Sequence, residues 1–236
     1  MEAVSDELAP VARGAVGHIA WPRRVGPKLT VLWGSKLAGI FGLMTAFFVG
    51  YFLVLRHPLY PVAVVPALAI DRLIGFHPWT LPLYFSLWAY IPLAPLMLST
   101  RRELASYAWA CLALSAAGLA IFLFWPTRVV PAEIDWAGHP GFTMLKSIDN
   151  AGNACPSLHA AFAVFSAVEI GRQLRRNGER GLFRALSWLW CLGILYSTLA
   201  TKQHVALDLL AGSALGLAAA AGHGLTAKRG PDMEAK

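Results

Sequence analysis

Long apolar runs alternate with short polar tracts along most of this chain. Five runs have about the 17 to 25 residues that a helix needs to cross the hydrocarbon core of a bilayer, and a sixth is slightly short. The runs cover residues 29–55, 81–98, 104–125, 156–171, 183–199 and 204–225, of which 156–171 is the short one. The pattern therefore predicts an all-α, polytopic membrane protein with six transmembrane helices.

The apolar segment 58–70 does not fit this pattern. It contains three prolines and reaches Asp71 after about a dozen residues, too few for a span. We interpret it as an interfacial or re-entrant piece.

The basic residues support six spans. Most of them lie in the two terminal tails, in the second loop and in the fourth loop, which six spans place on one side of the membrane. Because cytoplasmic loops are enriched in Lys and Arg, we expect a cytoplasmic N-terminal tail (1–28), a transmembrane domain (29–225) and a cytoplasmic C-terminal tail (226–236). A seventh span at 58–70 would scatter the basic clusters over both faces. Short loops and an N-terminus unlike a cleaved signal peptide favour a bacterial inner (plasma) membrane.

Composition excludes several classes of protein. Hydrophobic residues make up 57% of the chain and charged residues 14%, against about 25% charged in soluble domains, which excludes a soluble globule or a disordered chain. The net charge of +7 lies in tracts between apolar runs, so we expect no nucleic-acid partner. Cys111, Cys155 and Cys191 have neither disulfide-framework nor metal-ligand spacing, and we expect no cofactor.

Two short motifs carry candidate chemistry. The fourth span begins Cys155-Pro156-Ser157-Leu158-His159, where Pro suits the first helical position and the first amides can hold an anion. Ser157 and His159 add a donor and a proton carrier. Between the fifth and sixth spans, His204 and Asp208 are four residues apart, so on a helix they share a face and the carboxylate can orient the ring as a nucleophile or base.

The predicted topology brings these groups to one depth, at the outer interface. The converging residues are Arg128, Ser157, His159, Ser197, Lys202, His204 and Asp208. Such a set suits phosphoryl transfer, because cations and amides can hold phosphoryl oxygens while one imidazole attacks and the other protonates the leaving oxygen. The motifs offer no second or third carboxylate for a divalent-metal cage, so we predict no metal.

The motifs Pro156-Ser157-x-His159 and Ser197-x6-His204-x3-Asp208 resemble the second and third signatures of the type 2 phosphatidic acid phosphatase superfamily. The resemblance implies that His204 forms a phosphohistidine, that Asp208 orients it and that His159 is the acid for the leaving group. It also implies that Ser157 binds the phosphate together with its backbone neighbours.

The chain departs from the superfamily's pattern at three places. Thr198 stands where the usual Ser-Arg pair has Arg, so Lys202 would supply that positive charge. The first signature is absent, and Arg128 is the nearest substitute for its basic residues. Leu158 replaces the glycine of the second signature. With the run 201–204, these changes are similar to the inositol phosphorylceramide synthase branch, whose members move a phosphorylated headgroup between lipids.

Three functions therefore stay open. The first is a metal-independent lipid phosphatase that hydrolyses a monoester or diphosphate at the outer face, with Arg128, Ser157, Ser197 and Lys202 binding the phosphate. The second is a headgroup phosphotransferase, and the third a non-catalytic lipid-phosphate binder. A His–Asp pair can simply tie helices together, but ionisable groups within spans are functional by default. The sequence fixes neither the lipid, nor the role of the loop 127–155 in headgroup selection, nor the oligomeric state.

Overall fold

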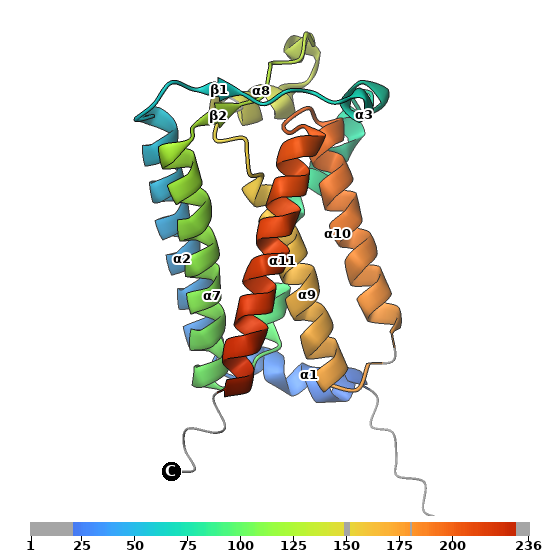
Figure 1. Ribbon diagram of the computed structural model, residues 1–236. Helices are drawn as coiled ribbons and strands as arrows, with labels where there is room; N and C mark the ends of the chain where they lie inside the picture. The colour runs from blue at the N-terminus through green and yellow to red at the C-terminus, as the bar shows by residue number, and fades with distance from the viewer. Residues whose placement is uncertain (1–20, 149–151, 180, 230–236) are drawn as a thin grey trace, which may run out of the picture.

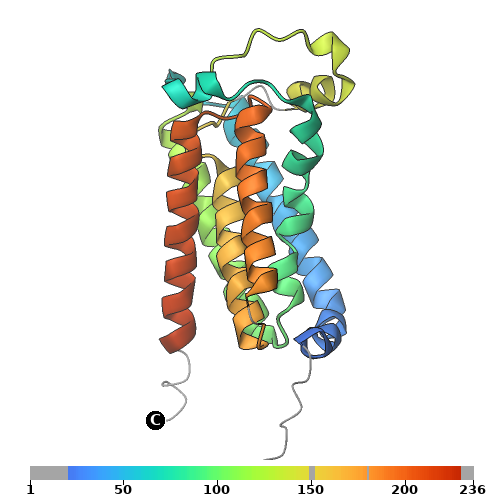
Figure 2. The same cartoon turned by 90° about the vertical axis from the view of Figure 1, so that its right-hand side faces the viewer.

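The computed structural model describes residues 21–148, 152–179 and 181–229. Long helices run side by side along one axis, with a cap of short elements at one end (Figures 1 and 2). The long helices are α2 (Trp33–Arg56), α7 (Arg101–Phe124), α9 (Leu158–Arg176), α10 (Leu182–Ala200) and α11 (Ala206–Arg229). Most of the two predicted tails, 1–20 and 230–236, lies outside the described residues.

Four helices among the described residues are long and apolar enough to cross a membrane: α2, α7, α10 and the part Ala206–Thr226 of α11. The chain is therefore a largely helical membrane protein. Four of the six predicted spans meet this criterion of length and hydropathy. The other two runs, 81–98 and 156–171, do not meet it, each for a physical reason.

The run 81–98 forms three short helices, α4 (Leu81–Phe85), α5 (Leu87–Tyr90) and α6 (Leu93–Leu96). Ser86 separates α4 from α5, and Pro92 lies at the break between α5 and α6, where proline lacks the amide hydrogen that continues a helix. The run 156–171 lies in α9, a continuous helix that carries Glu169 and Arg172 within its length. These charges lower its hydropathy, and α9 is largely buried within the bundle instead of facing lipid along its length.

The cap contains β1 (Ala63–Val64), α3 (Ala69–Leu73), η1 (Pro78–Thr80), β2 (Thr127–Arg128), η2 (Trp136–Gly138) and α8 (Pro140–Ile148). The segment 58–70 crosses this end of the bundle, where β1 pairs in parallel with β2 and Ala63 lies opposite Thr127. At the other end, α1 (Trp21–Thr30) lies across the base, on the same side as the end of α11 (Figure 1).

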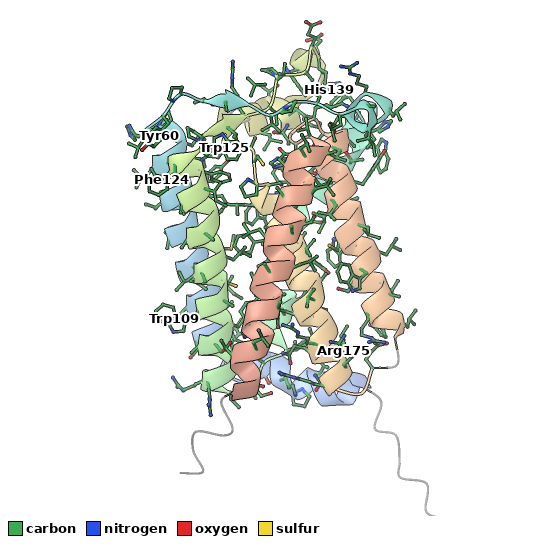
Figure 3. The ribbon with its side chains drawn as sticks, in the orientation of Figure 1. Tyr60, Trp109, Phe124, Trp125, His139 and Arg175 are labelled. Atoms are coloured by element: carbon green, nitrogen blue, oxygen red, sulfur yellow. The ribbon has the colours of Figure 1, made fainter. Side chains whose placement is uncertain are left out.

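Aromatic and basic side chains mark the two ends of the bundle. Tyr60, Phe124 and Trp125 lie at the cap end, where each is more than half exposed, and Arg175 lies at the base (Figure 3). Aromatic side chains gather at membrane interfaces, and basic ones on the cytoplasmic side.

Two glycines let α11 approach α9 closely. A Cβ atom on Gly212 would lie 2.1 Å from the Ser157 carbonyl oxygen, and one on Gly216 would lie 2.3 Å from that of Ala161. Small residues four positions apart permit such close backbone contact between membrane helices. The first turns of α9 and α11, which carry the two motifs, are thereby held together.

Candidate active site

His204 lies just before α11, with its ring oriented by Asp208. The ring Nδ1 is 2.9 Å from Oδ2 of Asp208. Because a carboxylate oxygen accepts, Nδ1 carries the hydrogen, so in the neutral ring Nε2 carries the lone pair. This is the tautomer that a nucleophile or base requires.

Asp208 is fully buried, and its two other oxygen atoms also accept hydrogen bonds. Its Oδ1 accepts from the Val205 amide at 2.8 Å, and its carbonyl oxygen accepts from the Ser157 amide at 2.9 Å. The carboxylate lies in the first turn of α11, where the helix dipole stabilises negative charge. Its position is therefore fixed from two helices.

His159 lies in the first turn of α9 and contacts α4. Its Nε2 donates to the Tyr84 carbonyl oxygen at 3.0 Å, since a carbonyl can only accept. The ring stacks on that of Tyr84, with centroids 4.1 Å apart and planes 13° apart, and Trp88 contacts it edge-on. Sequence reasoning missed Tyr84, because nothing in the chain links it to a residue 75 positions away.

The two histidines line one pocket. Asn153 and Tyr51 also line its outer part, and the pocket continues between α2, α4 to α6 and α7. The structure thus brings together the three residues predicted to be catalytic, from the starts of two neighbouring helices.

Ser157 and Ser197 are fully buried and make local hydrogen bonds. Ser157 is the N-cap of α9, where its Oγ accepts from the Ala160 amide at 3.2 Å. Ser197 donates through Oγ to the Ile194 carbonyl oxygen at 2.6 Å. In this arrangement both hydroxyls stabilise helix backbone beside the site.

The two predicted cations lie in the cap. The Lys202 amine donates to the carbonyl oxygens of Asp71, at 3.0 Å, and of Ile74, at the end of α3. Arg128 is exposed on β2 and is not among the residues that line the pocket. The structure therefore assigns partners to Lys202 outside the pocket, and the phosphate-binding roles of both residues stay predictions.

Asp71 ties the cap to the helix that follows His204. Its Oδ1 accepts from the Ala206 amide, and its Oδ2 from the Leu68 amide, both at 2.7 Å. Sequence analysis treated Asp71 only as the end of an apolar segment. Its partner lies 135 residues away, so no local pattern pointed to this contact.

Cys155 adjoins the second motif. Burial, and then the Asp208 carboxylate, raise the pKa of its thiol. A neutral thiol is a poor nucleophile, so Cys155 does not compete with the imidazoles. Within the described parts of the chain, no group of three or more His, Cys, Asp or Glu side chains could hold a metal ion.

The fold and the site together define a helical membrane protein in which an oriented imidazole and a second imidazole share one pocket. The family model of the PAP2 superfamily matches residues 76–222, so the chain belongs to that superfamily, the one that its motifs resemble. Its members are generally phosphatases or phosphotransferases, which makes this chain a phosphatase-type enzyme of lipid phosphates. Comparisons with curated proteins and with solved structures gave no match.

Proposed function

We propose that this protein hydrolyses a lipid phosphate monoester or diphosphate, without a metal, through a phosphohistidine on His204. The observation that carries the proposal is the 2.9 Å contact between His204 Nδ1 and Asp208, in a pocket that His159 also lines. Binding alone needs neither an oriented imidazole nor a second one beside it.

The reaction has two steps. In the first, the lone pair on Nε2 of His204 attacks phosphorus, and the bond from phosphorus to the lipid oxygen breaks. Asp208 stabilises the positive charge that develops on the ring, as a carboxylate does in other histidine-dependent enzymes. His159 enters this step as the imidazolium and gives a proton to the leaving oxygen. Because its Nε2 donates to the Tyr84 carbonyl, Nδ1 is the nitrogen that exchanges this proton.

In the second step, a water molecule loses a proton to Nδ1 of His159 and attacks phosphorus. The bond from phosphorus to His204 then breaks and releases inorganic phosphate. The first amides of α9, which lack acceptors within the helix, would hold phosphoryl oxygens together with Ser157. Arg128, Ser197 and Lys202 are proposed to support the phosphate from the cap side.

We also propose the topology. α9 and the segment α4 to α6 would complete six crossings with the four long apolar helices. Arg175 at the base (Figure 3) and the basic residues of α1 support a cytoplasmic base. Both termini would then be cytoplasmic and the site would face the periplasm or exterior, in a bacterial inner membrane.

A headgroup phosphotransferase is the second candidate. The run Thr201-Lys202-Gln203-His204 supports it, since it is similar to the inositol phosphorylceramide synthase branch. In that reaction, His159 would take the proton from a lipid hydroxyl in place of water, and the phosphorylated headgroup would pass to that acceptor.

Purified full-length protein with a panel of lipid phosphates, with and without an added lipid alcohol, tests these functions. We expect free phosphate from the wild type and none from His204→Ala, while His57→Ala, an exposed histidine outside the pocket, keeps the wild-type rate. Transfer to the added alcohol, seen by mass, would favour the transferase. Near wild-type phosphate release by His204→Ala would show that the nucleophile is wrong, and tight binding without turnover would favour a binder.

A further inference from the structure

Beyond the two histidines, the pocket continues as an apolar groove toward the base of the bundle. Successive turns of α2 line it, from Tyr51 near the histidines through Phe47 and Leu43 to Gly39 and Lys36. The rise along α2 from Lys36 to Tyr51 is about 22 Å at about 1.5 Å per residue. Half of a bilayer's hydrocarbon core is about 15 Å thick, so the groove passes the midplane.

Lys36 lines the inner end of this groove. Its side chain is fully buried, and its amine donates to the carbonyl oxygens of Lys28 at 2.6 Å and Leu96 at 2.8 Å. These carbonyls lie at the ends of α1 and α6, where helices leave carbonyl oxygens without helical partners. A buried ammonium needs such partners, so moving it aside would be costly.

We propose that Lys36 is the floor of a groove for the substrate's tail and sets the longest tail that fits. This rests on the proposed function, because the occupant is the tail of the lipid whose phosphoryl group meets His204. The groove is continuous with the pocket of the two histidines and is lined mainly by aliphatic and aromatic side chains. The α2 wall precedes residues 76–222, so the floor belongs to a part of the chain that the superfamily match does not cover.

The buried ammonium of Lys36 should set a sharp limit on the tail length up to which affinity increases. Relative to the free ligand in water, each methylene buried in the groove should improve affinity about fourfold, until the tail meets Lys36. A longer tail must either displace the ammonium from its carbonyl partners or leave its end outside the groove. Affinity should therefore rise with tail length and then stop rising.

Lys36 also joins α1, α2 and α6, and a purely structural role would explain its burial. The readout must therefore be one that loss of stability does not shift, which is the tail length at which affinity stops rising. Gly39 provides a variant that leaves Lys36 and its bonds in place. It lines the groove one turn above Lys36, and a Cβ there meets no atom within 4 Å.

The matched control is Gly42, on the same helix. It is exposed, it is not among the residues that line the groove, and a Cβ there also meets nothing within 4 Å. Gly39→Leu should fill the lower groove and raise its floor by about 4.5 Å, the rise of α2 over the three residues from Lys36 to Gly39 at about 1.5 Å per residue. Gly42→Leu should leave the floor where it is.

The experiment uses full-length protein in amphipol, without bilayer lipid to dissolve the tails, and single-chain alkyl phosphates from octyl to tetracosyl. Binding is measured as the ligand-dependent rise in unfolding temperature, and phosphate release is measured in parallel. We expect the wild type and Gly42→Leu to share one cut-off length, Gly39→Leu to stop at tails about 4.5 Å shorter, and Lys36→Ala to accept longer ones. If Lys36→Ala does not fold, the cut-off length of Gly39→Leu tests the proposal without it.

An unchanged cut-off in Gly39→Leu, or no binding of any alkyl phosphate by the wild type, overturns the proposal. The two proposals fail separately. If the cut-off length shifts but no phosphate is released, the proposed hydrolysis is wrong and the role of Lys36 as the floor of the groove stands. If phosphate is released but the cut-off length does not shift, only the proposed role of Lys36 is wrong.

Discussion

Replacing Gly212 by Ala should damage catalysis through the backbone, without touching a catalytic side chain. The new Cβ would lie 2.1 Å from the Ser157 carbonyl oxygen, and ordinary contact begins near 3.4 Å. Since the obstacle is backbone, the two helices must separate by about 1.3 Å, because a close-packed interior cannot absorb the overlap. Gly212 lies one turn after Asp208, so the separation acts directly on the hydrogen bond from the Ser157 amide to Asp208.

The expected magnitudes follow from this displacement. Overpacking costs about 1 to 3 kcal/mol of stability, and the better helix propensity of Ala returns up to about 1 kcal/mol. A misplacement of about 1 Å between catalytic groups can lower turnover about 100-fold. Activity should therefore fall further than stability suggests.

The assay compares Gly212→Ala with Gly222→Ala, by phosphate release and by thermal unfolding. Gly222 is on the same helix and exposed, and an added Cβ there meets no atom within 4 Å. The control should keep the wild-type rate and lose no stability. The reasoning is refuted if Gly212→Ala keeps both the wild-type rate and the wild-type Tm.

Three further substitutions probe the surrounding contacts. Asp71→Ala removes the acceptor of the Ala206 amide and should lower stability by about 1 kcal/mol, as loss of a helix cap does; an unchanged Tm would mean that the bond contributes nothing. Asp208→Asn presents an amide to Nδ1 of His204 and should lower kcat by as much as about 10⁴-fold through the wrong tautomer, so a loss below about tenfold would contradict its orienting role. Lys202→Met should lower kcat/KM about tenfold or more, because a charged hydrogen bond to phosphate contributes about 1.5 to 3 kcal/mol. A fall in Tm with kcat/KM unchanged would instead limit the Lys202 amine to its partners in α3.

The parts of the site that the sequence predicted depend on local spacing. His204 and Asp208 are four residues apart, and this spacing predicted their contact. The structure forms the contact across the start of α11, because His204 lies just before the helix and Asp208 lies in its first turn. The partners that were missed, Tyr84 and Asp71, lie 75 and 135 residues from the groups they bind. In each contact one partner is a backbone atom, the Tyr84 carbonyl oxygen in the first and the Ala206 amide in the second, and a pattern of side chains along the sequence does not record such partners.

The prediction of the membrane helices was limited in the same way, because local composition does not show how a helix packs in the bundle. The uniformly apolar runs became α2, α7, α10 and α11, because burial in lipid needs little beyond length and apolar composition. The apolar composition of the run 81–98 did not reveal that it would divide into three short helices. Nor did the composition of the run 156–171 reveal that α9 keeps charges by packing inside the bundle, where Glu169 pairs with Arg172.

The bond from Asp71 to the Ala206 amide has a practical consequence for protein engineering. A shortened protein that begins at residue 76, where the superfamily match starts, would lose the carboxylate that holds the first residue of α11. It would also lose the Leu68 amide that orients this carboxylate. A shortened protein that keeps this connection between the cap and α11 must therefore begin upstream of residue 68 and include residues that the superfamily match does not cover.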